Sequence, residues 1–330
     1  MFRIIARSLK TGILTEAAPC PAPSSFSFPV MDFSRCVACD ECAQSCPTGA
    51  IQTSPRAPGR KTVTLSYGPC IQCGECVSGC PQQAIRVSHD VEVAAYTRQQ
   101  LKRTGLFDVD PVSGRWVFRE MELQEGPSIE ESAARLRDRI RGRLGRSLHV
   151  RQVDAGSCNA CELEIAATTN PMFDLERFGV HLVASPRHAD VLLVTGPVTR
   201  NMEIPLRRTY EAAPEPRVVV AVGACGCSGG IFAEGTYASV GGVDRVLPVD
   251  VYIPGCPPRP EMLIHAVMML QDKVMKESIR DRRDAPDEEA REAITPGTLP
   301  VTDGSTLNQQ DETISKPYTI ASRHEKRRSF

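Results

Sequence analysis

The chain has 330 residues, of which 41% are hydrophobic and 24% are charged, a composition typical of globular proteins. Its formal net charge of −1 argues against nucleic-acid binding as its main task. No apolar run approaches the roughly 18 residues that a membrane-spanning helix needs. Fourteen cysteines and no recognisable signal peptide predict a reducing compartment, by default the cytoplasm, where thiolates are free to bind metal.

Residues 1–30 are expected to form a short helix followed by a connector. Over residues 1–16 apolar side chains recur at helical spacing, and cations fall on another face. Such a helix can lie on an anionic membrane surface or dock on another subunit, and the sequence leaves both open. Residues 17–30 are rich in proline and serine and indicate an extended segment.

Residues 31–95 carry two copies of one cysteine pattern, which begin at Cys36 and Cys70. Both read C-x2-C-x2-C-x3-C-P, the run that holds two 4Fe-4S clusters in bacterial ferredoxins. Three cysteines of each run bind one cluster and the fourth binds the other. The first predicted cluster is therefore bound by Cys36, Cys39, Cys42 and Cys80. The second is bound by Cys70, Cys73, Cys76 and Cys46.

A disulfide framework and a zinc site fit these cysteines less well. Disulfide frameworks suit secreted chains, and the duplicated spacing is too regular for one. Zinc sites use paired C-x2-C motifs rather than three-plus-one runs. The repeat also continues past the cysteines, because Pro47–Ile51 mirrors Pro81–Ile85. We therefore expect an α+β ferredoxin-like two-cluster domain built from two pseudo-symmetric halves.

Residues 96–146 are predicted to be a linker that contains a basic helix. The stretch up to Pro127 has no clear periodicity, and Ser128–Glu131 then has the form of a helix capping box. An apolar stripe follows, surrounded by arginines. No aromatic residues interleave with these arginines, which argues against a nucleic-acid arm and favours a solvated or partner-facing helix.

Residues 147–276 have the pattern of an α/β domain. Short runs rich in β-branched residues alternate with helical segments, which predicts a doubly wound, flavodoxin-like parallel sheet. The expected strands are 180–184, 191–194, 218–222 and 249–253, and the expected helices are 162–168, 199–212 and 259–276. Residues 277–330 are charged and poor in aromatics, so we expect a largely disordered tail.

Four further cysteines lie at the ends of these elements: Cys158, Cys161, Cys225 and Cys256. Cys158 and Cys161 stand at the start of an expected helix, and Cys225 and Cys256 each follow an expected strand. Ligands collect beyond the carboxyl ends of strands in open α/β sheets. We therefore predict that these four thiolates bind a third 4Fe-4S cluster.

The glycine-rich loop Gly223–Gly230 could also suggest a nucleotide site, and it contains a second cysteine beside Cys225. It does not have the G-x-G-x-x-G spacing of a dinucleotide site, and no acidic ribose-binding position is evident, so a nucleotide is not expected. Cys227 competes with Cys225 for the ligand position, and we favour Cys225 because it lies nearer the strand end. Cys20, in the proline-rich connector, is expected to be a plain thiol.

These motifs resemble a known family. Gly156–Ile165, Ser185–Met202, Gly223–Gly226 and Val251–Pro258 resemble the proximal-cluster motifs of small subunits in group 4, energy-converting nickel–iron hydrogenases of the formate hydrogenlyase type. The domain is also similar to the cluster-bearing subunit beside the quinone site in respiratory complex I. There the first two cysteines are adjacent, and the separation here favours the hydrogenase branch. Residues 1–95 resemble the two-cluster ferredoxin subunit of the same complexes, so the chain looks like a fusion.

The resemblance implies an electron-transfer subunit that relays electrons through three 4Fe-4S clusters to or from a nickel–iron site. That site would belong to a partner large subunit, so no complete active site is expected here. Membrane subunits, an upstream electron donor and a peripheral position at the cytoplasmic face of the membrane are also implied. Two alternatives remain: a subunit of a complex I-like quinone oxidoreductase or nickel-free complex, and a free electron carrier. Glu162, Glu164 and His188 are given no catalytic role.

Overall fold

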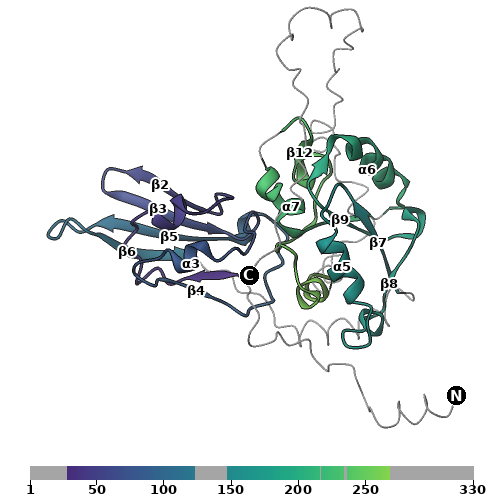
Figure 1. Ribbon diagram of the computed structural model, residues 1–330, viewed down its shortest axis with the longest axis horizontal. Helices are drawn as coiled ribbons and strands as arrows, with labels where there is room; N and C mark the ends of the chain where they lie inside the picture. Colours follow the sequence, from purple (N-terminus) through teal and green to yellow (C-terminus); the bar gives the residue numbers. More distant parts are fainter. Residues whose placement is uncertain (1–27, 123–146, 216, 234–235, 268–330) are drawn as a thin grey trace, which may run out of the picture. The chain divides into compact units, whose positions relative to one another are not determined.

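The computed structural model describes residues 28–122, 147–215, 217–233 and 236–267, all within one compact unit, Met1–Pro286. Figure 1 labels their main strands and helices. The expected N-terminal helix, the basic helix after Pro127, the expected tail 277–330 and Cys20 lie outside the described residues.

A five-stranded parallel sheet forms the core of the second half of the chain. Its strands are β7 (Leu148–Asp154), β8 (Val180–Leu182), β9 (Val191–Thr195), β11 (Val218–Val222) and β13 (Val251–Ile253). Their spatial order is β13-β11-β9-β7-β8. Counted along the chain, this is the order 2-1-3-4-5, which is flavodoxin-like. The prediction of a parallel α/β domain is confirmed.

The pattern of burial explains which strands the sequence predicted. Every residue of β9, β11 and β13 is buried, as expected for strands covered on both faces, and these runs were recognised. Strand β7 was not predicted. Its buried Leu148, Val150 and Val153 alternate with half-buried polar residues such as Arg151, so no continuous apolar run marks it. It nevertheless pairs with both β8 and β9.

The connections between the parallel strands contain the helices. Helices α5 (Ala160–Ala167), α6 (Arg200–Ala212) and α7 (Gly223–Ser228) follow β7, β10 and β11, and residues 260–267 are also helical. The observed ends of α5 and α6 lie within about two residues of the predicted ends, which is the usual uncertainty of a helix boundary. A two-stranded antiparallel ladder joins β10 (Val198–Thr199) to β12 (Ser239–Gly241). Short 3-10 turns at 175–178, 186–188, 230–232 and 243–245 complete this half.

The duplicated cysteine segments have matching local structure. Strand β1 (Pro29–Met31) pairs antiparallel with β4 (Ile85–Val87). One short helix follows the loop of the first cysteines in each copy, α2 (Glu41–Gln44) and α3 (Glu75–Ser78), and each carries the third cysteine of its run. The sequence repeat is therefore a repeat of local structure.

A four-stranded antiparallel sheet contradicts part of the predicted linker. It consists of β2 (Ile51–Ala57), β3 (Arg60–Ser66), β5 (Lys102–Val109) and β6 (Trp116–Glu122), in that order. Residues 102–109 and 116–122 are thus strands, and the 3-10 turn 99–101 leads into them. Fully buried Phe107 packs against Phe33 and Phe118, with ring centroids 6.4 and 5.8 Å away. This aromatic contact depends on partners distant in sequence, which a local pattern cannot reveal.

The segment between β4 and β5 is joined to the edge of the parallel sheet. Ala95 N–H donates to the Tyr252 carbonyl at 3.0 Å, and Tyr252 N–H donates back to the Ala95 carbonyl at 2.8 Å. Reciprocal bonds of this kind satisfy backbone groups that the edge strand β13 would otherwise leave open. Residue 95, where the sequence placed a domain boundary, is therefore part of a structured connection.

His265 makes the stability of the fold depend on pH. It is 3% exposed, and neither ring nitrogen has a hydrogen-bond partner within the described ranges. Burial lowers the pKa of His265 to about 4, against the opposing charge of Asp90. In the unfolded chain the pKa is about 6.5. Between these values only the unfolded chain binds the proton, so stability falls as the pH falls from about 6.5 to about 4.

Replacing His265 should flatten this pH dependence. In His265→Leu the free energy of unfolding should lose a slope of up to about 1.4 kcal/mol per pH unit between about pH 6.5 and about pH 4. Urea unfolding at several pH values measures it. The exposed His188→Leu is the matched control and should retain the slope. An unchanged curve for His265→Leu would contradict the assignment.

Candidate metal centres

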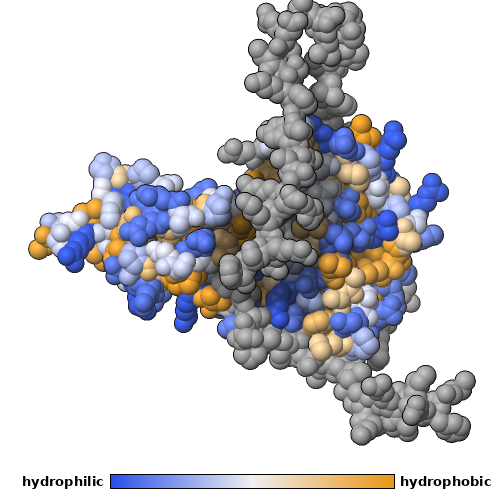
Figure 2. All heavy atoms as spheres, in the orientation of Figure 1, coloured by the Kyte–Doolittle hydropathy of each residue, from blue (hydrophilic) through white to orange (hydrophobic). Residues whose placement is uncertain are grey.

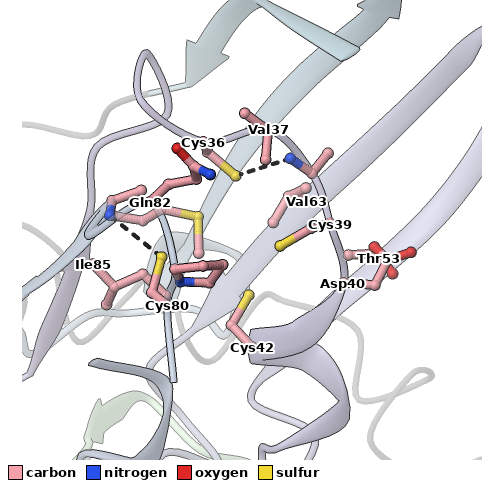
Figure 3. Close-up of a pocket in the computed structure, with 14 residues that line it drawn as sticks. Cys36, Val37, Cys39, Asp40, Cys42, Thr53, Val63, Cys80, Gln82 and Ile85 are labelled. Atoms are coloured by element: carbon pink, nitrogen blue, oxygen red, sulfur yellow. Dashed lines mark hydrogen bonds between the residues drawn. The ribbon is translucent and has the colours of Figure 1, made fainter. Parts of the chain in front are cut away.

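The first predicted quartet converges on one space. Cys36 and Cys39 come from the loop that enters α2, Cys42 lies in α2 itself, and Cys80 follows α3. Figure 3 shows their four sulfur atoms around a pocket that all four residues line. Burial raises the pKa of Cys42 to about 12, and the charges of Cys36, Cys39 and Cys80 contribute to this rise. The structure brings together the four residues that the sequence grouped.

The second quartet has the same arrangement. Burial raises the pKa of Cys76 to about 12, and the charges of Cys70, Cys46 and Cys73 add to the rise. Burial therefore favours the protonated form of Cys42 and Cys76 when no metal is bound. Metal binding must therefore displace protons, and the bound cations must compensate for the buried thiolate charge.

The backbone of the cysteine loops is shaped to surround an anion. Left-handed φ values occur at Ala38 (49°), Asp40 (71°), Gln72 (58°), Gly74 (83°) and Asn159 (69°). The first four occupy equivalent positions in the two copies, and Asn159 lies between Cys158 and Cys161. A left-handed residue beside right-handed ones turns successive N–H groups to one side, the nest found at many iron–sulfur sites. Non-glycine residues hold this conformation only where the surroundings enforce it.

Backbone N–H groups also donate to the cysteine sulfurs. The donors and acceptors are Ala38 to Cys36 (3.4 Å), Ala50 to Cys46 (3.2 Å) and Ala84 to Cys80 (3.3 Å). Such bonds stabilise thiolates and tune cluster potentials. In the part of the chain that the structure describes, no three or more Cys, His, Asp or Glu side chains are spaced for a single metal ion. The thiol quartets and their N–H donors fit a cluster of several irons.

The third quartet lies beyond the carboxyl ends of β7, β11 and β13. Cys158 and Cys161 follow β7, Cys225 lies in α7 after β11, and Cys256 follows β13. Burial raises the pKa of Cys161, as do the charges of Glu162 and of the other three cysteines. The topology therefore places the four thiols at one edge of the sheet, and their binding of a cluster stays a prediction.

Gly223 allows two ligand loops to approach each other. Its φ is +82°, and a Cβ there would lie 2.7 Å from Cys161 Sγ, closer than side chains tolerate. Next to it, Ala224 N–H donates to the Gly255 carbonyl at 2.6 Å, which joins the loop of Cys225 to that of Cys256. The glycine-rich loop thus has a steric explanation that involves the thiols.

Cys225 and Cys227 differ in their surroundings. Cys227 is fully buried, and its thiol donates to the Ala221 carbonyl at 3.6 Å. Cys225 is partly exposed, and its pKa is raised to about 11 by burial and by the charges of Cys256 and Cys158. This supports Cys225 as the ligand, which stays a prediction.

The three polar residues to which the sequence assigns no catalytic role differ in their surroundings. The Glu162 carboxylate accepts a hydrogen bond from the Thr195 hydroxyl, which accounts for its position without proton transfer. Burial raises the pKa of Glu164, with a further contribution from Glu261. His188 is exposed in the turn 186–188.

Two residues that contact the ligand loops, Gln72 and Arg98, are not predicted by the sequence motifs. Gln72 Oε1 accepts a hydrogen bond from Cys256 N–H at 3.0 Å, which links the second quartet's loop to the third quartet. Arg98 Nε donates to the Cys227 carbonyl at 2.9 Å. Gln72 occupies the position of Ala38 in the first copy, so a comparison of the copies could have singled it out. Arg98 lies in no motif and is far from its partner along the chain.

Two regions of the chain match known protein families. Residues 158–270 match the family described as NADH ubiquinone oxidoreductase, 20 Kd subunit, and residues 35–84 match a 4Fe-4S dicluster domain. A probable membrane-bound hydrogenase subunit of Pyrococcus furiosus is 50% identical over 133 residues, covering 40% of this chain and 79% of that subunit. The chain belongs to this NADH ubiquinone oxidoreductase subunit family.

Further relatives of the chain are subunits of two kinds of complex. Formate hydrogenlyase subunit 7 of Escherichia coli is 49% identical over 142 residues, which are 43% of this chain and 55% of that subunit. A subunit of the NADH-quinone oxidoreductase of Geotalea daltonii is 52% identical over 117 residues, 36% of this chain and 68% of that subunit. The chain thus spans about half the length of the Escherichia coli relative. It combines the oxidoreductase subunit family with a dicluster domain.

Substitution of the two rival cysteines tests the third site. In Cys225→Ser the iron content should fall from about twelve to about eight atoms per chain, because a four-iron cluster loses a thiolate ligand. Cys227→Ser, the matched control two positions away, should retain all the iron. Iron analysis and spin quantitation of the reduced protein measure both. The reverse result would assign Cys227 as the ligand.

Proposed function

We propose that this chain is the electron-transfer subunit of a membrane-associated group 4 nickel–iron hydrogenase complex. The observation that carries the proposal is the set of three thiol quartets, the last two joined by the Gln72–Cys256 hydrogen bond. Each 4Fe-4S cluster, when bound, accepts and releases one electron. The chain's own task is to hold the thiolates, exclude water from them and keep the three sites in a set order.

The residues that would hold the clusters are those grouped by sequence. Cys36, Cys39, Cys42 and Cys80 hold the first cluster. Cys70, Cys73, Cys76 and Cys46 hold the second, within a ferredoxin-like domain of two similar halves. Cys158, Cys161, Cys225 and Cys256 hold the third. The Gln72–Cys256 contact supports an order in which the second cluster lies between the first and the third.

The nickel–iron site is proposed to lie in a partner large subunit, because the quartets already use the well-placed cysteines. Apolar side chains break the polar surface in several places (Figure 2). Leu163 is 64% exposed and closely follows Cys161, and Ile231 and Phe232, 59% and 46% exposed, follow the loop of Cys225. Exposed apolar groups beside a redox site suit a subunit interface.

Attachment to the membrane is proposed to be peripheral, at the cytoplasmic face. No helix in the described ranges is long and apolar enough to cross a membrane. The Pyrococcus furiosus relative bears the name of a membrane-bound hydrogenase subunit. Membrane subunits and an upstream electron donor complete the proposed assembly.

A complex I-like quinone oxidoreductase, or a related complex without nickel, is the second candidate. The likeness to the NADH-quinone oxidoreductase subunit favours it. The two residues that separate Cys158 from Cys161 favour the hydrogenase instead, since the resemblance to complex I implies adjacent cysteines.

Metal analysis of the intact complex separates these candidates. The complex purified through this chain should contain nickel in stoichiometric amount and about twelve irons for each copy of the chain. It should also reduce a dye with hydrogen as the electron source. Cys225→Ser should retain the nickel and lose roughly 90% or more of this activity, because the path of clusters between the two ends is broken. Quinone reduction by a complex without nickel would support the second candidate.

A further inference from the structure

The two halves of the cysteine repeat differ in one charged contact. Lys61, on strand β3, donates from Nζ to the Ala38 carbonyl at 2.9 Å and forms an ion pair with Asp40. In the second copy Gln72 and Gly74 take the places of Ala38 and Asp40. Gln72 there accepts from Cys256 N–H. The first quartet thus has a cation against its ligand loop, and the second loop has no carboxylate to form the same ion pair because Gly74 stands in the place of Asp40.

The surroundings of Lys61 hold this cation in place. Its side chain is 12% exposed, and Nζ lies 5.7 Å from the centroid of the Trp116 ring on strand β6. The same Ala38 that accepts from Lys61 donates its N–H to Cys36 Sγ. A positive charge is therefore fixed against the loop that holds the first three thiols, and it is largely shielded from water.

We propose that Lys61 raises the reduction potential of the first cluster above that of the second. Reduction adds negative charge to a site that already holds four thiolates, so a nearby cation in a low-dielectric environment stabilises the reduced form. The negative charge of Asp40 partly offsets that of the cation, so the ion pair as a whole sets the reduction potential of the first cluster. Lys61 acts on the cluster through its charge and does not bind it. The inference rests on the proposed function only in requiring a cluster at the first quartet.

Removal of the Lys61 charge should lower the reduction potential of one of the three clusters. In the full chain, purified in its complex with clusters bound, Lys61→Met should shift one step of a redox titration followed by electron paramagnetic resonance. At a fixed potential the ratio of reduced to oxidised first cluster should fall about tenfold, equivalent to about 59 mV for one electron. The other two steps should not move.

Two further variants distinguish charge from loop structure. Lys61→Arg keeps the cation and should restore most of the potential. Asp40→Asn removes the opposing charge and should move the same step upward. Loosening of the loop would instead move the potential in one direction for Lys61→Met and Asp40→Asn alike. Emission of Trp116, the chain's single tryptophan, checks the packing of the strands in each variant.

Arg60 provides the matched control. It precedes Lys61 on β3, so its side chain points to the opposite face, where it pairs with Asp108 at 3.3 Å. Arg60→Gln removes the same charge from the neighbouring position and should leave all three steps in place. A shift equal to that of Lys61→Met would show that net charge alone is responsible and would overturn the proposal.

The outcomes are independent of the hydrogenase assignment. A complex without nickel would refute the proposed function and leave the Lys61 result intact. Full iron content with no shift in Lys61→Met would overturn the inference and leave the proposed function intact. Should Lys61→Met lose iron from the first site, Asp40→Asn decides: an upward shift supports the inference, and a downward shift or none overturns it.

Discussion

Buried sulfur charge is the constraint on which the rest of this structure depends. Cys42, Cys76 and Cys161 are each at most 9% exposed, and burial opposes the ionisation of a thiol. Thiolates in such positions need metal cations and N–H donors around them. Left-handed residues in the loops turn N–H groups inward, and Gly223 removes the side chain that would collide with Cys161. The local backbone follows from the sulfur chemistry.

The parallel sheet and the cysteine repeat bring cysteine thiols together in different ways. The repeat wraps three thiols in one loop and takes the fourth from the other copy. The sheet instead gathers thiols from the ends of three strands, β7, β11 and β13. Hydrogen bonds then join the two systems, through Gln72 to Cys256 and through Ala95 to Tyr252. The two groups of thiols are thus linked within one polypeptide.

Near-symmetry of the two halves makes their differences informative. Equivalent loop positions share left-handed φ values, yet one carries Ala38 and the other Gln72. The first loop faces Lys61 from the antiparallel sheet, and the second faces a predicted ligand of the third site. Two sites with the same donor set can therefore have different electrostatic surroundings, and such differences tune iron–sulfur potentials.

The sequence by itself determined the cysteine repeat and the parallel α/β domain, because fixed spacings and continuous apolar strands are local signals, and it predicted a grouping of the thiols. It placed Cys225 and Cys256 together since strand ends share one edge of a sheet. It missed strand β7, whose polar residues alternate with buried ones, and strands β5 and β6, whose packing depends on Phe33 far away in the chain. Only the tertiary structure decided that Lys61, Gln72 and Arg98 meet the ligand loops, because contacts between distant segments leave no periodic trace in sequence.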